Sequence, residues 1–185
     1  MENLFLSGSL KIKNLHPVFK KRISKAASEG FGFLVGDASG SDSSIQELLS
    51  ELKVNNVTVY CSGSTPRNNL GNWPVNNVFP SAPEGTRAYF TAKDVQMADD
   101  ASGGIMIWDA ASTGTLSNVF ELIYRNRESE VFVNKLKKFI AIKSPVDVSN
   151  LVSMMSPAAF DKANKKIGIS KKIERINPSQ SGFDF

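Results

Sequence analysis

Apolar and polar positions follow two alternating patterns along the chain. Nearly continuous apolar runs cover residues 3–9, 31–37, 56–63 and 104–110, and each run predicts a strand. Four segments between and after these runs carry apolar side chains at helical spacing, and each predicts a helix. They are residues 16–30, 41–54, 89–100 and 115–126. Residues 130–135 and 138–143 predict two closing strands that pair through a lysine-rich turn.

The order of these elements indicates the fold class and the domain organisation. Continuous apolar strands are typical of sheets that are buried on both faces, and regular strand–helix alternation favours parallel pairing. We therefore expect an α/β fold, a doubly wound and mostly parallel sheet with helices on both faces. The length of 185 residues fits one domain with a small appendage. We assign residues 1–150 to the α/β domain and residues 151–185 to a C-terminal basic helical extension and tail.

Residues 64–87 interrupt the pattern, because Pro, Gly and Asn are frequent there and no apolar periodicity is visible. The stretch is too long for a plain connector, so we expect a functional or partly mobile loop. Within it, Arg67 could pair with a phosphate and Trp73 could stack on a base. The alternative is a loop that is packed by its own side chains.

Composition narrows the class of protein. Hydrophobic residues make up 41% of the chain, which is enough for a sizeable core. The single cysteine, Cys61, cannot form an intramolecular disulfide, and with the single histidine, His16, it cannot build a typical zinc site. We expect no metal and no cofactor. The chain has neither a signal-peptide core nor an apolar run of bilayer length, which favours a cytoplasmic protein without a membrane partner.

Charge is spread unevenly along the chain. The net charge of +4 permits an anionic ligand but does not require nucleic acid. Residues 161–175 are rich in lysine, which indicates either a solvated helix or a contact with nucleic acid or an acidic partner. No aromatic residues are interleaved with these lysines, which argues against base stacking there. Nucleic acid is therefore the less favoured partner.

Three loops that carry small or acidic residues follow the carboxyl ends of predicted strands, where doubly wound sheets bind their ligands. The first contains Ser7, Gly8 and Ser9. The second contains Gly36, Asp37, Gly40 and Asp42. The third contains Asp109, Ser112, Gly114 and Thr115. We expect these residues to bind one ligand together.

The second and third loops could each bind part of a ligand, or each could have only a structural role. Glycines allow the backbone to approach a ligand, and the free amides at a helix start can bind an anion. The aspartates suit sugar hydroxyls better than phosphate. Alternatively, Asp42 and Ser112 simply cap the helices that follow them. Neither loop is a Walker A sequence or a GxGxxG fingerprint. Lys93 and Asp94, in the helix predicted over 89–100, are further candidates for the site, or else form a solvated helix face.

Taken in order, the motifs SGS, GDASGSD and STGT resemble those of the SLOG superfamily of Rossmann-like nucleotide-binding domains. This superfamily includes the LOG phosphoribohydrolases, the DNA-processing protein of transformation, and sensor domains of nucleotide-triggered defence. The blocks VTVYCSG, PRNN and MIWD also resemble those of a bacterial and phage group, and the likeness covers residues 3–135. The resemblance implies a Rossmann-like fold, a nucleotide or nucleotide-derived ligand, and a homo-oligomer.

The chain departs from this pattern where the phosphoribohydrolases have PGGxGTxxE. Asn118 stands at the position of the catalytic glutamate, and an amide cannot act as a nucleophilic carboxylate or as a general base. Glu121, one turn later, is a conceivable substitute. Two functions follow: a binding protein or sensor whose site includes Asn118, or an N-glycosidic hydrolase or transferase. For the second function the candidate catalytic residues are Asp94, Asp109 and Glu121.

Overall fold

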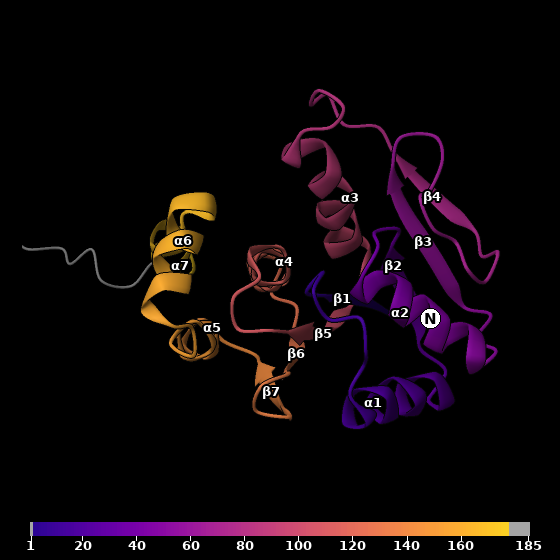
Figure 1. Ribbon diagram of the computed structural model, residues 1–185, viewed down its shortest axis with the longest axis horizontal. Helices are drawn as coiled ribbons and strands as arrows, with labels where there is room; N and C mark the ends of the chain where they lie inside the picture. The colour runs from indigo at the N-terminus through magenta and orange to yellow at the C-terminus, as the bar shows by residue number, and fades with distance from the viewer. Residues whose placement is uncertain (1, 178–185) are drawn as a thin grey trace, which may run out of the picture.

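The computed structural model describes residues 2–177, so residues 178–185 of the expected tail lie outside the described part of the chain. Its strands are β1 (Asn3–Gly8), β2 (Gly32–Gly36), β3 (Val57–Ser62), β4 (Val75–Val78), β5 (Gly103–Trp108), β6 (Ser129–Val133) and β7 (Lys138–Ile142). Its helices are α1 (Pro17–Ser28), α2 (Ser41–Glu51), α3 (Arg87–Asp100), α4 (Thr113–Tyr124), α5 (Pro145–Val152), α6 (Pro157–Ile167) and α7 (Ile169–Ile176). Figure 1 shows their arrangement around one sheet.

The sheet has the strand order β4-β3-β2-β1-β5-β6-β7. Every neighbouring pair is parallel except β6 and β7, which pair in antiparallel register. The chain leaves β1 toward β2 on one side and later adds β5 on the other side of β1. The point of reversal therefore lies between β1 and β5, where a crevice opens in sheets of this kind. The expectation of a doubly wound, mostly parallel α/β sheet is confirmed.

Helices cover both faces of the sheet, and each face has its own apolar core. On one face, Phe19 and Ile23 of α1 and Ile45 of α2 pack against Leu6 and Val35. On the other face, α3, α4 and the C-terminal helices cover side chains that include Phe5, Met106 and Trp108. Strand residues thus alternate between two buried surfaces, which explains why the apolar runs in the sequence are continuous.

β4 lies inside the stretch that the sequence presents as irregular. It has four residues, all half-buried, and it pairs only with β3 at the edge of the sheet. Two of its residues, Asn76 and Asn77, have low strand propensity, so the sequence pattern does not reveal it. The pairing with β3, rather than local preference, creates this strand.

The C-terminal segment is helical and packs on the body of the protein. The expected boundary at residue 150 falls inside α5. Ala163 of α6 and Ile169 of α7 are fully buried in the core that α4 shares. The side chains of Lys172 and Arg175 lie over the ring of Tyr124, 5.3 and 4.4 Å from its centroid. α6 and α7 are therefore fixed against α4. No helix in residues 2–177 combines the length and apolarity that a membrane crossing needs.

Candidate functional site

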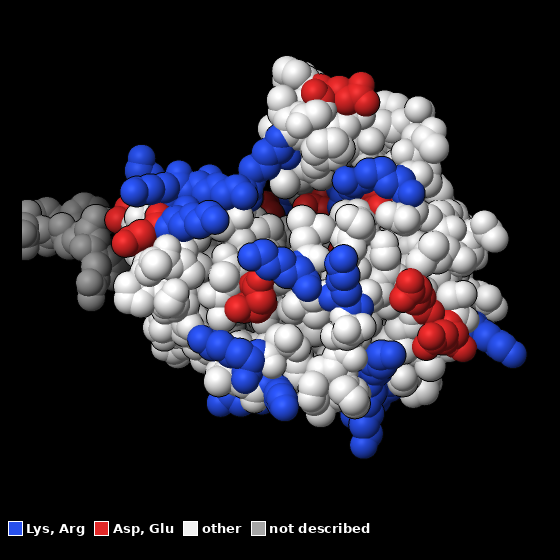
Figure 2. Space-filling model, in the orientation of Figure 1, with Lys and Arg blue, Asp and Glu red and all other residues white. Residues whose placement is uncertain are grey.

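A cavity of about 630 Å³ opens at the carboxyl ends of β1, β2 and β5, between α3, α4 and α6. Six basic and three acidic side chains line it: Lys11, Arg67, Arg87, Lys93, Lys162, Lys166, Asp42, Asp94 and Asp109. Figure 2 shows a hollow in this region, with Lys and Arg on both sides and acidic atoms deeper in. The volume lies within the range of about 300–1,000 Å³ that is typical of small-molecule sites. The excess of basic groups favours an anionic occupant.

Most of the residues expected from the sequence meet in this cavity. Its walls include Ser7, Gly8, Gly36, Asp42, Arg67, Lys93, Asp94, Asp109, Ser112, Gly114, Thr115 and Asn118. Ser9, Asp37, Gly40, Trp73 and Glu121 do not line it. The structure gives a physical reason for each of these five placements.

Ser9 lies behind the cavity and joins the loops that follow β1 and β5. Its hydroxyl accepts a hydrogen bond from the amide of Asp109 at 3.1 Å and lies 3.4 Å from the hydroxyl of Thr115. A nearby bond on α4 ties the same elements together, because Asn118 Nδ2 donates to Ser7 Oγ at 3.2 Å. Both asparagine and serine are buried. These bonds fix the two loops relative to each other.

The N-terminus of α4 faces the cavity with its backbone open. Asp109 Oδ1 accepts from the amides of Ala111 and Ser112, at 3.0 and 2.7 Å, and so shapes the turn before the helix. Ser112, at the N-cap, makes no side-chain cap bond within the described residues. A Cβ added to Gly114 would meet no atom within 4 Å. The first turn of α4 therefore leaves room and free amides for an anion.

The loop after β2 is held against the loop after β1 by Gly40. This residue, at the N-cap of α2, has φ of 84° and ψ of −126°, a conformation that is essentially restricted to glycine. An added Cβ would lie 2.2 Å from the backbone oxygen of Leu10. Gly40 thus serves close packing of two loops and does not face the cavity.

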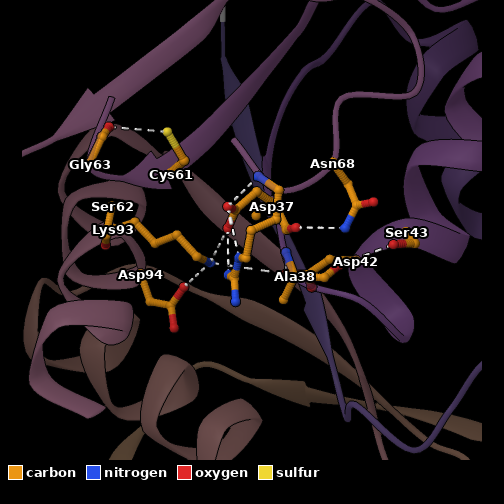
Figure 3. A network of polar contacts seen from close by, with 12 residues as sticks. Asp37, Ala38, Asp42, Ser43, Cys61, Ser62, Gly63, Asn68, Lys93 and Asp94 are labelled. Atoms are coloured by element: carbon orange, nitrogen blue, oxygen red, sulfur yellow. Dashed lines mark hydrogen bonds and ion pairs between the residues drawn. The ribbon is translucent and has the colours of Figure 1, made fainter. Parts of the chain in front are cut away.

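Asp37 lies at the centre of a polar network (Figure 3) and forms an ion pair with Arg67. Arg67 donates to both of its carboxylate oxygens, from Nη2 at 2.6 Å and from Nε at 3.0 Å, and the Arg67 amide donates to it as well. Burial acts to raise the pKa of Asp37, but the hydrogen bonds from Arg67 and the charge of Lys93 outweigh it and lower the pKa. Asp37 is 2% exposed and anchors the long loop to the end of β2.

Lys93 is buried among three carboxylates (Figure 3). Its Nζ lies 2.8 Å from Asp94 and 4.0 Å from both Asp37 and Asp42. Burial acts to lower the pKa of Lys93, but the neighbouring carboxylates outweigh it and raise the pKa. The ammonium group therefore stays charged and offsets part of the negative charge at the floor of the cavity.

Asp42 is the carboxyl of this network whose negative charge is least stabilised by neighbouring groups. Burial raises its pKa to about 6, although the charge of Lys93 and a bond from the Ala38 amide act in the opposite direction. The neighbouring charge of Asp94 raises it further. Asp42 thus places a titrating carboxyl in the cavity wall within the physiological pH range.

Asp42→Asn is expected to stabilise the protein more at pH 8 than at pH 4. A carboxyl whose pKa is higher in the folded chain, about 6 against 3.8, stabilises the fold when protonated, and that contribution is lost as the pH rises through 6. The gain of the variant over wild type should grow across this interval by no more than about 3 kcal/mol, at roughly 1.4 kcal/mol per pKa unit. Urea unfolding of both proteins at several pH values measures it. A stability difference that is the same at every pH would contradict the raised pKa.

Trp73 is not available for stacking on a base in the cavity. It is buried in the core under α1 and α2, and its Nε1 donates to the carbonyl of Val54 at 2.9 Å. Two other aromatic residues, Phe90 and Trp108, contribute to the site. Phe90, which is 38% exposed, is in the cavity wall, and buried Trp108 braces the start of α4 by donating to the carbonyl of Ser112.

Glu121 points away from the cavity and cannot replace the missing glutamate there. Its carboxylate pairs with Arg125 at 2.8 Å and lies 4.0 Å from Lys172 of α7. Three residues after Asn118, it has turned toward the C-terminal helices that pack on α4. It therefore has a structural role in attaching α7.

Helices α3 and α6 contribute cavity residues that the sequence alone did not single out. Arg87 and Phe90 of α3 line one wall beside Asp94, which the sequence did indicate, and Ala159, Lys162 and Lys166 of α6 line another. Each set has the three- or four-residue spacing of one helix face. This spacing is visible in the sequence, but which face turns to the cavity depends on how each helix packs.

Comparison with known proteins supports the fold and no more. No protein-family model matches the chain, and no curated protein matches it. Among solved structures, DNA processing protein A from Helicobacter pylori is similar, with a TM-score of 0.52 and 13% sequence identity over 90% of this chain and 81% of that chain. That structure was described for its single-stranded DNA binding mode. The likeness confirms the Rossmann-like architecture.

Proposed function

We propose that this protein is a divergent SLOG-type protein that binds a nucleotide or nucleotide-derived ligand without cleaving it. The observation that carries the proposal is the basic cavity at the point where the strand order reverses, between the open N-terminus of α4 and the loops after β1 and β2. Nucleotides commonly bind at this place in doubly wound sheets. The fold of a protein described as binding single-stranded DNA is consistent with it.

The cavity offers a separate group for each part of a nucleotide. The first amides of α4, together with Gly8 and the hydroxyl of Thr113, suit a phosphate. The Asp109 carboxylate and the Asn118 amide can bond to sugar hydroxyls. The guanidinium of Arg67 lies over one face of the Phe90 ring, 5.0 Å from its centroid, and the other face would supply an aromatic surface for a base. The ligand would lie across the ends of β1 and β5.

The contacts of the acidic groups support binding without cleavage. Asn118, at the position of the family's glutamate, donates to Ser7 and offers no carboxylate. Asp94 is paired with Lys93, and Asp109 accepts two backbone amides. Attack on a sugar carbon would require a carboxylate oxygen that faces the sugar, and these contacts orient Asp94 and Asp109 toward groups of the protein.

One observation favours N-glycosidic cleavage as the second candidate function. Asp42, with its pKa raised to about 6, lines the cavity and is protonated in part of the molecules near neutral pH. A carboxyl in that state can protonate a departing base. In that reaction Asp94 or Asp109 would have to leave its present partners and face the sugar.

Calorimetric titration separates these two functions. The panel consists of nucleoside mono- and diphosphates of the four common bases, ADP-ribose, a 5′-phosphorylated dinucleotide and inorganic pyrophosphate. Each mixture is then analysed by chromatography for free base. We expect binding of at least one nucleotide with no base released. Base release that Asp42→Asn abolishes would favour the second function, and no heat from any compound would reject both.

Phe90→Ala is expected to weaken nucleotide binding through loss of a stacking surface. Stacking of a base on an aromatic side chain contributes about 1–3 kcal/mol, which is roughly a five- to 150-fold change in affinity. Titration with the tightest nucleotide of the panel measures it, and the affinity for inorganic pyrophosphate should stay unchanged. Phe79→Ala removes a phenylalanine that is 73% exposed outside the cavity and serves as the control. Equal losses in the two variants would contradict the stacking role.

A further inference from the structure

The acidic side chains of the cavity are already matched by partners within the protein. Asp42 and Asp94 surround the ammonium group of Lys93, and Asp109 accepts the amides before α4. Among the basic side chains, Arg67 is committed to Asp37. None of these carboxylates forms an ion pair with the remaining basic side chains of the cavity wall among the described residues.

Four cations in the cavity wall form no ion pair with the described residues: Lys11, Arg87, Lys162 and Lys166. Arg87 lies by the N-terminus of α4, with Nη1 3.4 Å from the hydroxyl of Thr113. Lys162 and Lys166 lie on α6. These four side chains carry four positive charges and a phosphomonoester carries about −1.5 to −2 charges near pH 7, so a single phosphate could not pair with all of them.

The lysines of α6 are held at the wall by the packing of the helix. Ala163, one residue after Lys162, is fully buried in the core, and Phe160 packs against the same core. Ser156 caps the start of α6, and Gly168 ends the helix in the left-handed conformation. Lys162 and Lys166 are four residues apart, so both project from one face, together with Ala159 in the cavity wall. Lys162 and Lys166 are therefore held by α6, whereas Arg87 is held at the start of α3.

We propose that Lys162 and Lys166 of α6 form a second phosphate subsite, so that the ligand of this cavity is a small nucleotide with at least two phosphoryl groups. The proposal rests on the proposed function and names its ligand class. One phosphoryl group binds at the N-terminus of α4 beside Arg87, and the other binds at the α6 lysines. A nucleoside diphosphate and a 5′-phosphorylated dinucleotide both carry this chemistry. The cavity volume of about 630 Å³ favours such a small ligand over a long strand.

The test compares ligands and lysine variants by calorimetry on the full chain. The ligands are the best-binding nucleoside as its mono- and diphosphate, the 5′-phosphorylated dinucleotide of the same base, and a twelve-residue single-stranded oligonucleotide. We expect the diphosphate or the dinucleotide to bind at least tenfold more tightly than the monophosphate. Whichever of the two binds more tightly identifies the spacing of the phosphates. Lys162→Ala should weaken that ligand about three- to tenfold and the monophosphate less than twofold.

Lys165→Ala is the matched control, because it removes the same charge from the same helix at an exposed position outside the cavity wall. It should leave all affinities within twofold of wild type. Equal affinity for mono- and diphosphate, with no effect of Lys162→Ala, would overturn the second subsite and leave nucleotide binding intact. An oligonucleotide that binds more tightly than both two-phosphate ligands would overturn the small-ligand assignment. Absence of binding by every nucleotide would overturn this proposal together with the proposed function.

Discussion

Replacing Lys93 with methionine is expected to lower the free energy of unfolding by about 3–5 kcal/mol at pH 8, the usual cost of removing one partner from a buried ion pair. Lys93 is 4% exposed, and its ammonium group lies within 4.0 Å of Asp37, Asp42 and Asp94. Methionine preserves much of the side-chain volume and leaves the carboxylates without their shared cation. Urea unfolding of the variant and of wild type measures the loss.

The pH dependence of this loss identifies its electrostatic origin. Without Lys93, the folded-state pKa of Asp42 should rise further above its unfolded value, so the stability of the variant should fall as the pH rises toward 8. At pH 5 a protonated Asp42 relieves part of the penalty. Adding Asp42→Asn to Lys93→Met should restore some of the lost stability at pH 8. A loss that is independent of pH and is not relieved by the second substitution would assign the effect to packing instead.

Gly40→Ala is expected to destabilise the protein by about 4 kcal/mol, because backbone strain and overpacking each cost about 1–3 kcal/mol. The alanine Cβ would be forced to 2.2 Å from the backbone oxygen of Leu10 at a positive φ of 84°. Neither atom belongs to a flexible side chain, so the loops after β1 and β2 would have to separate. Ligand affinity should fall with stability, because both loops line the cavity. Thermal and urea unfolding, followed by titration, measure the two effects.

Gly30→Ala separates the two causes of this effect. Gly30 has a φ of 85°, nearly that of Gly40, but an added Cβ would meet no atom within 4 Å. This variant therefore carries the backbone strain alone, about 1–2 kcal/mol, and lies away from the cavity. A loss of stability in Gly30→Ala as large as that in Gly40→Ala would contradict the destabilising role assigned to the contact with Leu10.

The sheet and the loops of the site were predictable because they depend on local patterns. A parallel strand that is buried on both faces must be apolar throughout, and the small polar residues that follow such strands gather at one edge by topology alone. β4 was not predictable in this way, since Asn76 and Asn77 become strand only by pairing with β3. Its existence is a tertiary effect.

The aromatic contact and the α6 lysines depend on packing that no local pattern specifies. Trp73 was a candidate for stacking on a base, with a loop packed by its own side chains as the alternative. The structure has the alternative, because the ring of Trp73 is buried and its nitrogen donates to Val54. Phe90, on α3, has the contact with the cavity that Trp73 lacks. The lysines of α6 were interpreted as a solvated face or a partner contact. They reach the cavity because Ala163 is buried and orients the helix.

Because α6 forms part of the cavity wall and is also docked on α4, its docking and the occupancy of the cavity are thermodynamically linked. An occupant that contacts Lys162 or Lys166 binds more tightly to molecules in which α6 is in place. By reciprocity, it raises the population of the docked state by the same factor that docking raises its affinity.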